Sequence, residues 1–274
     1  MIYVLLSVAC SVLVSVLLKV AKRTDFQIGQ AVAWNYAVTS ACTLIMLQPS
    51  LAPLRTTAAP WLALVGLGVL LPTIFLALGA SVVHAGIVRT DAAQRLSLLV
   101  SLMAAFTMFG EAIDSLRIGG CVLGLAAMGA MVWRGRTAHW VYPVLVFVGS
   151  GVIDVLFKRV AASHVPLGPA LLAVFTLALI VAFVIEFLRG TRFDLRSFIA
   201  GVLLGLFNFG NILFYLQAHR ALPANPALVF ASMNLGVVAL GALVGLLLFR
   251  ERLNRVNLGG LGLALIAVGL LAHG

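Results

Sequence analysis

The sequence predicts an all-α integral membrane protein in which ten transmembrane helices form two inverted five-helix repeats around a central cavity. Three observations lead to this prediction: the composition of the chain, the number of its apolar runs, and a phrase that occurs twice. Of 274 residues, 63% are hydrophobic and 9% are charged, whereas soluble domains carry about 25% charged residues. With a mean hydropathy of +1.16, the chain cannot cover itself with a water-compatible surface and must face lipid.

Ten apolar runs are long enough to cross a bilayer, since a span needs about 20 predominantly apolar residues. Short connections that contain Gly, Pro and charged residues separate the runs. The first run lacks the basic start and the small-residue cleavage site of a secretory signal, so we take it as the first helix. The predicted spans are 2–20, 28–47, 60–83, 92–110, 116–133, 140–162, 166–187, 196–218, 226–249 and 256–272.

Two short phrases recur at an almost constant offset. Residues 109–120 read FGEAIDSLRIGG, and residues 249–260, which lie 140 positions later, read FRERLNRVNLGG. A second pair of similar stretches is VLLKVAKR at residues 16–23 and VLFKRVAA at residues 155–162. This pair places Lys19 and Lys158 at the ends of the first and sixth spans. Each phrase therefore occupies the same place in one of two five-span units.

The odd number of spans in each unit determines how the two units lie. Five spans return the chain to the opposite side of the membrane, so the second unit must be inverted relative to the first. We therefore predict a first repeat over residues 1–137 and an inverted second repeat over residues 138–274. Inverted repeats are the architecture of many alternating-access transporters.

The second repeat also resembles a known family. The stretch NPALVFASMNLGVVALGALVGLLLFRERLNRVNLGGLGLALIAVG is similar to the second repeat of the drug/metabolite transporter superfamily, in its ten-helix EamA-type branch. The resemblance extends through both halves and implies a secondary transporter, more often an exporter, with ten helices around a substrate cavity. The first span is also similar to that of the small multidrug resistance proteins. Those proteins carry a membrane glutamate where this chain has Ser11, with Ser150 in the second repeat.

Two acids within or beside spans are candidates for proton coupling. Asp154 lies inside the sixth span and Asp91 at the start of the fourth, and each precedes a base by four residues, Lys158 and Arg95 respectively. This spacing places both charges of a pair on one helical face. Each pair either neutralises itself at low dielectric or serves a substrate or proton role.

Polar side chains at membrane depth are the candidate substrate-binding groups. Gln94 and Arg95 offer donors to a carboxylate or phosphate, although the same stretch can be read as an interfacial cap of the fourth helix. Asn208, Asn211 and Tyr215 are spaced i, i+3 and i+7, so they form a stripe that either joins helices or lines a wet cavity.

Other spans contribute weaker candidates. Trp34 and Tyr36 in the second span belong either to an interfacial aromatic belt or to the cavity, and Asn35 between them shares a helical face with Thr39 and is a candidate lining residue. Asn234 is a lone amide in the ninth span, and Lys158 completes the set of predicted substrate-binding residues. Two pairs of glycines spaced four apart, Gly201 with Gly205 and Gly241 with Gly245, indicate close helix packing.

These observations predict a transporter of a small polar metabolite or drug, with protons as the candidate coupling ion. We expect no enzymatic activity, cofactor, metal or nucleic-acid partner, because the chain lacks the corresponding motifs. The expected partners are a small-molecule substrate and the lipid bilayer, and the protein is expected to be a monomer or homodimer. The alternatives are a membrane-embedded transferase acting on a lipid-linked substrate, or a channel.

The distribution of basic residues predicts the orientation of the protein in the cell (inner) membrane. Of the 18 lysines and arginines, thirteen fall in the odd-numbered connections between spans and five in the even-numbered ones. The positive-inside rule places the basic connections in the cytoplasm. Both termini are therefore predicted to be non-cytoplasmic.

Overall fold

Helices make up almost all of the chain that the structure, a computed structural model, describes. The described residues are 1–55, 59–108, 115–132, 140–163, 165–222, 226–251 and 253–273. No strand occurs in these ranges. The all-α prediction is therefore confirmed.

The first half begins with long apolar helices and continues with shorter ones. The first helix ends where Asp25 takes a left-handed backbone conformation, with φ 55° and ψ 38°. The elements of this half are α1 (Ile2–Thr24), α2 (Ile28–Leu47), the 3-10 turn η1 (Ala52–Arg55), α3 (Trp61–Ala85), α4 (Ile87–Leu96), α5 (Leu98–Met108) and α6 (Ser115–Val132).

The predicted fourth span differs from its expected form. It starts at Ile87, earlier than expected, so Asp91 lies inside a helix and not at its start. The span is also divided at Ser97 into α4 and α5, because the Ser97 hydroxyl donates a hydrogen bond to the Gln94 carbonyl (2.6 Å). A serine that bonds back to the preceding turn competes with the backbone ladder and commonly bends a helix.

The second half has a similar order of long and short helices. Its elements are α7 (Val141–Ala162), α8 (Leu167–Leu188), α9 (Leu195–Ala221), α10 (Pro226–Leu243), the π-helical turn η2 (Val244–Leu248) and α11 (Arg255–His273). The first-half copy of the repeated phrase falls largely outside the described residues, since 109–114 are not among them.

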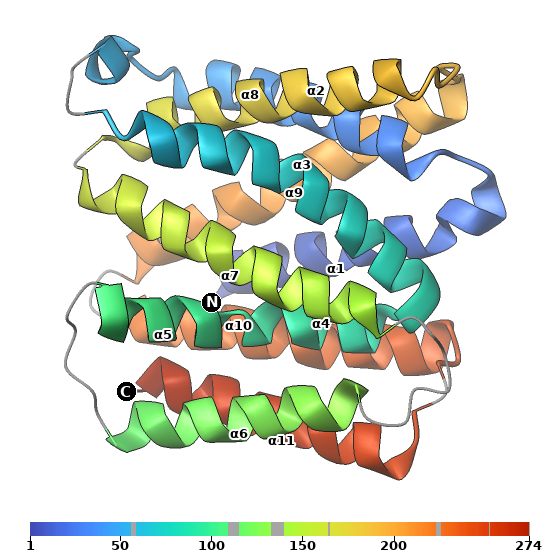
Figure 1. The fold of residues 1–274 in the computed structure, drawn as a ribbon, viewed down its shortest axis with the longest axis vertical. Helices are drawn as coiled ribbons and strands as arrows, with labels where there is room; N and C mark the ends of the chain where they lie inside the picture. Colours follow the sequence, from blue (N-terminus) through green and yellow to red (C-terminus); the bar gives the residue numbers. More distant parts are fainter. Residues whose placement is uncertain are drawn as a thin grey trace.

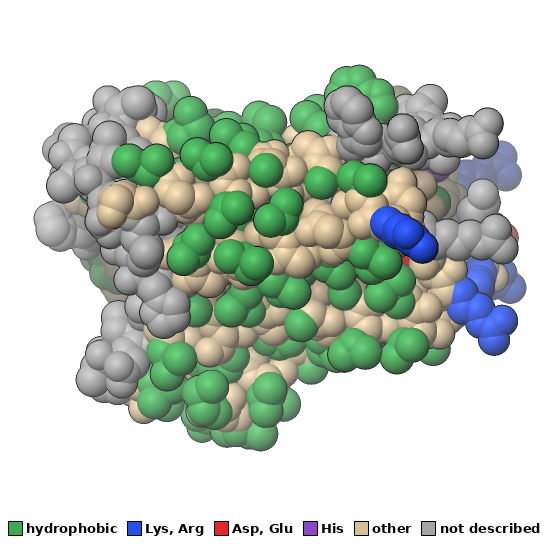
Figure 2. Space-filling model, turned by 90° about the horizontal axis from the view of Figure 1, so that it is seen from below, with side chains coloured by type: hydrophobic (Ala, Val, Ile, Leu, Met, Phe, Trp, Pro, Cys, Tyr) green, Lys and Arg blue, Asp and Glu red, His purple; other side chains and the backbone are tan. Residues whose placement is uncertain are grey.

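Five helical segments in the described ranges are long and apolar enough to cross a membrane. Their mean hydropathy lies between 1.8 and 2.8, and they are Ile2–Ala21, Trp61–Ala85, Leu167–Leu188, Leu195–Ala221 and Leu228–Leu248. Large apolar side chains also lie exposed on the outside of the bundle, for example Leu62 and Phe187. Figure 2 shows such side chains over one face of the molecule, with lysines and arginines gathered at one end. The protein is therefore suited to a lipid environment.

The helices pack as two groups. In Figure 1, α2, α3, α8 and α9 lie together at one end of the long axis, and α6 packs against α11 at the other. A hydrophobic cluster joins α1–α3 to α7–α9, and a second cluster joins α4, α6, α10 and α11. The helices α1, α4, α7 and α10 lie between the two ends.

The predicted glycine pairs mark close helix contacts. A Cβ atom at Gly201 would lie 2.5 Å from Trp34 Cβ, and one at Gly205 would lie 2.6 Å from Val38 Cβ, so α9 can approach α2 only without these side chains. In the same way Gly241 faces Asp91 and Gly245 faces Val88. The prediction of close packing is confirmed for both pairs.

Candidate functional site

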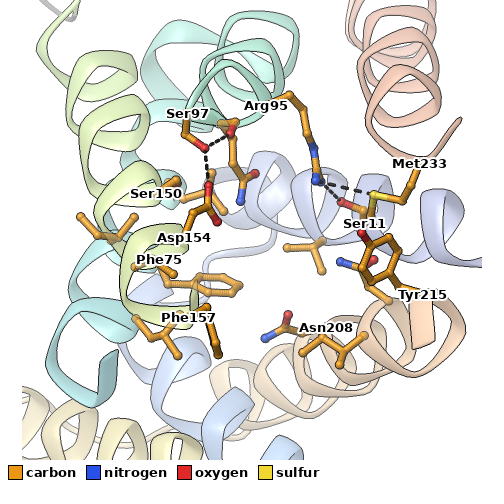
Figure 3. Close-up of a pocket in the computed structure, with 18 of the residues that line it drawn as sticks. Ser11, Phe75, Arg95, Ser97, Ser150, Asp154, Phe157, Asn208, Tyr215 and Met233 are labelled. Carbon is orange, nitrogen blue, oxygen red and sulfur yellow. Dashed lines mark hydrogen bonds between the residues drawn. The ribbon is translucent and has the colours of Figure 1, made fainter. Parts of the chain in front are cut away.

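A cavity of about 480 Å³ lies between the two halves of the chain. This size suits a small organic ligand. Helices of both halves line it (Figure 3), and it combines an apolar wall with polar side chains. The polar lining residues are Ser11, Ser15, Tyr36, Gln94, Arg95, Ser97, Ser150, Asp154, Asn208, Asn211, Tyr215 and Asn234.

Arg95 enters the cavity from α4 and is held at its tip by two other helices. Its Nη2 donates to Ser11 Oγ of α1 (2.9 Å), and its Nη1 donates to Asn234 Oδ1 of α10 (3.2 Å). Nε is buried and has no hydrogen-bond partner among the described residues. The guanidinium is thus fixed in place and keeps donor capacity for a ligand.

Asp154 faces the cavity from α7. Its Oδ2 accepts a hydrogen bond from Ser97 Oγ (3.1 Å), which lies at the junction of α4 and α5. Figure 3 shows Asp154 and Arg95 on different sides of the cavity. Among the described lining residues these two carry the formal charges, so the lining is neutral overall but strongly polarised.

The stripe on α9 forms another side of the cavity. Asn208 donates to Asn35 Oδ1 (3.0 Å), and Asn211 Oδ1 accepts from Ser7 Oγ (2.7 Å). Tyr215 is the third member, and its ring stands edge-on to His219. The stripe therefore both joins helices and contributes to the cavity, so the two readings of this pattern are compatible.

Apolar side chains complete the lining. Phe75 of α3, Phe157 of α7 and Phe175 of α8 lie beside the polar groups, together with leucines and isoleucines of the same helices. Such a wall excludes water from a ligand and strengthens the polar contacts it makes.

Four predicted site residues lie elsewhere. Trp34 packs edge-on against Phe183 and Phe198, because its face of α2 turns toward α8 and α9. Asn35 is fully buried and reaches the cavity only through its bond to Asn208. Lys158, one turn beyond Asp154, is partly buried but does not line the cavity.

Asp91 is the fourth, and it does not line the cavity. Its side chain is buried (2% exposed) and its Oδ1 accepts a hydrogen bond from Ser15 Oγ of α1 (2.7 Å). The Oδ2 atom has no hydrogen-bond partner among the described residues and faces Gly241 of α10. The sequence alone placed Asp91 at a helix start, where water would reach it.

One end of the bundle is closed by an ion pair between the halves. Lys19 Nζ lies 3.1 Å from Glu251 Oε1 and also donates to the Val82 carbonyl. Glu251 accepts from the backbone N–H of Ile87 (2.7 Å) and of Val88, so it caps the start of α4. We call this end, formed by residues 25–27, 86, 189–194 and 249–251, the closed face.

A second polar cluster joins the halves at the same face. The buried Gln30 donates to the Arg192 carbonyl (2.6 Å) and accepts from the Asp194 N–H (3.1 Å). Gln27 N–H donates to Ser197 Oγ (2.8 Å). Asp194 caps α9 by accepting from Ser197 N–H and Oγ, and these hydrogen bonds hold the pKa of Asp194 below its usual value.

The cavity extends away from the closed face. Leu167, a lining residue, is the first residue of α8, at the end opposite the 189–194 connection. Leu216 and Phe230 line the same end, near the close of α9 and the start of α10. The cavity is therefore sealed on one side by inter-half polar contacts and lies nearer the other.

Several of these groups carry little or no signal in the sequence. Ser15 and Ser97 gave no signal, because single serines are common in membrane helices. Ser11 and Ser150 were noted only as the positions of a missing glutamate, and both line the cavity. Glu251 lies in a connection, as predicted, and its recurrence in the repeated phrase is the sequence signal for its role there. Among the described residues, no group of His, Cys, Asp and Glu is placed to hold a metal ion.

Comparison with known proteins places the chain in a family and supports its fold. No protein-family model matches it. A solved crystal structure of a protein shares the fold with a TM-score of 0.55, at 14% identity, over 97% of this chain and 96% of that one. An uncharacterized protein of Haemophilus influenzae is 40% identical over 281 residues, which cover 97% of this chain and 96% of that protein. The chain belongs to the same protein family as this Haemophilus influenzae protein.

Proposed function

We propose that the protein is a secondary transporter that exports or exchanges a small polar metabolite or drug by alternating access. The observation that carries the proposal is the cavity of about 480 Å³, which both halves line and which inter-half contacts close on one side. A carrier needs such a site at the interface of two units that can rock against each other. The chain would then be a ten-helix member of the EamA-type branch that its sequence resembles.

The pattern of helix contacts supports two inverted repeats, 1–137 and 138–274. Exchanging each first-half helix with its counterpart converts the contact of α1 with α9 into that of α7 with α3. It also converts the contact of α2 with α9 into that of α8 with α3. The contact of α1 with α10 becomes that of α7 with α4 and α5, which together correspond to α10. Each of these pairs is in contact, as a two-fold relation requires. Contacts of α2 with α8 and of α6 with α11 would lie on the axis.

The charges in the cavity indicate the class of substrate. Arg95 suits a carboxylate or phosphate, since a guanidinium binds either through charge-assisted hydrogen bonds. Asp154 suits an ammonium or a polar hydrogen on the same molecule, and the phenylalanine wall suits an apolar segment. An anionic or zwitterionic metabolite fits this arrangement better than a purely cationic drug.

The proposed orientation places the closed face in the cytoplasm. That face carries the basic connections, which the positive-inside rule assigns to the cytoplasmic side of the inner membrane. The cavity would then lie nearer the outer side, and both termini would be non-cytoplasmic. A C-terminal alkaline phosphatase or fluorescent-protein fusion tests this: a fluorescent, phosphatase-negative fusion would reverse the assignment.

Counterflow in proteoliposomes tests the transport function itself. Vesicles loaded with an unlabelled metabolite, chosen by a thermal-shift screen of anionic, zwitterionic and cationic compounds, should accumulate the labelled compound with saturable kinetics. Flux that rises linearly with concentration would instead indicate a channel. Conversion of a lipid-linked substrate without accumulation would indicate a transferase. Vesicles containing the Arg95→Gln variant are the matched control.

A further inference from the structure

Three polar contacts connect α1 to α4. Ser11 bonds Arg95, Ser15 bonds Asp91, and Lys19 pairs with Glu251, which caps Ile87. The α1 members are spaced i, i+4 and i+8, and the α4 members descend by the same step, so the contacts form one seam between the two helices. The seam runs from the cavity at Arg95 to the closed face at Glu251.

Asp91 makes the middle contact of the three, and only one of its two carboxylate oxygens accepts a hydrogen bond from the described residues. Ser15 donates to Oδ1 at 2.7 Å, while Oδ2 has no hydrogen-bond partner among the described residues. The charged groups that act on Asp91 are Arg95 of its own helix and Glu251 of the connection after η2. Lys19 of α1 is held by Glu251, and α10 presents Gly241, which has no side chain to offer.

This environment distinguishes the two protonation states of Asp91. A buried carboxylate oxygen without a donor loses its hydration without replacement, which disfavours the charged form. The neutral acid avoids this cost and keeps the hydrogen bond from Ser15. If α1 parts from α4, water reaches both oxygens and the charged form becomes favourable. Opening and deprotonation are therefore linked through one side chain.

We propose that Asp91 is a proton-binding site that controls the closed face: the proton is held while α1 and α4 are in contact and is released when they separate. This inference rests on the proposed alternating-access function, because it assigns the proton to one of the two states of the carrier. Protonation favours the closed face, so acid should hold that side shut and alkali should allow it to open.

Asp91 acts on the closed face, whereas Asp154 lies in the cavity. Asp91 does not itself line the cavity, although its hydrogen-bond partner Ser15 does. Asp91 would therefore set the population of the closed state rather than carry a proton together with the substrate.

Distance measurements between spin labels at the closed face test the proposal on the purified protein. Labels at Arg23 and Arg255, both exposed near this face, require Cys10, Cys42 and Cys121 to be replaced first. We expect a single short distance between the two labels in acid. As the pH rises, a second population with a longer distance should grow. Asp91→Asn, which mimics the neutral acid, should keep the short distance throughout, whereas Asp154→Asn should respond to pH as the unsubstituted protein does.

A second variant covers the case in which Asp91→Asn does not fold. Ser15→Ala removes a hydrogen bond that Asp91 receives only while α1 and α4 are in contact, so the closed state loses stability and the midpoint of the distance change should move to lower pH, by on the order of one unit. A pH response that persists unchanged in Asp91→Asn, or no pH response at all, would overturn the proposal. A response to sodium at constant pH would also overturn it, because the bound ion would then not be a proton.

The two proposals fail separately. Saturable counterflow without any pH-dependent distance would leave a transporter whose closed face is not controlled by Asp91. A pH-dependent distance that Asp91→Asn abolishes, without saturable counterflow of any compound, would leave the proton site and refute the transport function.

Discussion

Asp91 and Asp154 have the same local sequence pattern and opposite surroundings. Each stands four residues before a base on a helix, and neither is near another acid in sequence. Yet Asp154 faces a cavity with Ser97 as its partner, while Asp91 is buried between α1 and α10, and one of its oxygens has no hydrogen-bond partner in the described part of the chain. The sequence spacing determines which face of a helix a side chain lies on. The packing of neighbouring helices determines whether that face contacts a cavity or another helix.

The bases that follow the two acids differ as well. Arg95 reaches over the cavity to Ser11 and Asn234, which makes it the group most exposed to a ligand's charge. Lys158 lies outside the cavity lining. The first half thus supplies the binding cation and a buried acid, whereas the second half supplies the acid in the cavity.

Removing the charge of Arg95 should have the largest effect. Arg95→Gln keeps a hydrogen-bond donor but loses the charge-assisted bond to an anionic group, so substrate affinity should fall by roughly 10- to 100-fold. Isothermal calorimetry with the compound found by thermal shift measures this directly. The matched control is Arg89→Gln on the same helix, because Arg89 donates to Asn257 of α11 and does not line the cavity.

Two results of comparing Arg89→Gln with Arg95→Gln would contradict a binding role for Arg95. Equal losses of affinity in Arg89→Gln and Arg95→Gln would mean that charge on α4 stabilises the fold in general. Unchanged affinity in both variants would place the substrate away from Arg95.

Neutralising Asp154 should remove the pH dependence that arises from substrate binding in the cavity, leaving only the dependence that Asp91 imposes through the closed face, and should leave exchange partly intact. Asp154→Asn mimics the protonated acid, so the proton and the substrate no longer compete for this side chain. We expect exchange rates within about ten-fold of the unsubstituted protein. Counterflow measured from acid to alkaline buffer gives the profile. If the profile is unchanged, Asp154 has a structural role and the pH dependence must arise at Asp91.

Weakening the closed face should have a smaller effect that is independent of the substrate. Glu251→Gln removes the 3.1 Å ion pair with Lys19 and weakens the hydrogen bonds to α4, so the stability of the protein should fall by about 1–2 kcal/mol. The midpoint of thermal unfolding reports the loss. Asp25→Asn is the control: its 4.0 Å pair with Arg196 is exposed on both sides and should contribute about 0–1 kcal/mol. Equal destabilisation by both variants would contradict a closing role for Glu251.

The sequence predicted features that depend on helix periodicity. Composition identified the all-helical, lipid-facing class, and the i, i+3, i+7 stripe grouped Asn208, Asn211 and Tyr215, which line the cavity together. Gln94 and Arg95 line it as well, although they could equally have formed a cap at the helix start.

Features that depend on contacts between distant segments could not be read from the sequence. Trp34 and Asn35 lie outside the cavity lining because the rotation of α2 is set by its packing against Gly201 and Gly205 of α9. Glu251 caps a helix that begins 164 residues earlier in the chain, and no local pattern encodes that partnership. The burial of Asp91 likewise depends on an earlier helix start than expected and on a glycine in α10.

A third acid, Asp194, provides the reference for the other two, because it lies at the surface outside the membrane spans. As the N-cap of α9 it accepts hydrogen bonds from Ser197 N–H (2.8 Å) and Oγ (2.7 Å), so Asp194→Ala should cost about 1 kcal/mol. The same bonds lower its pKa in the folded protein. A lowered pKa means that the stabilisation is present at neutral pH and is lost as the pH falls through the folded-state value. The gap in unfolding midpoint between Asp194→Ala and the unsubstituted protein should therefore narrow in acid. A gap that widens in acid would show that Asp194 does not act through its ionised form. Asp194 would then not serve as the surface reference for Asp91 and Asp154.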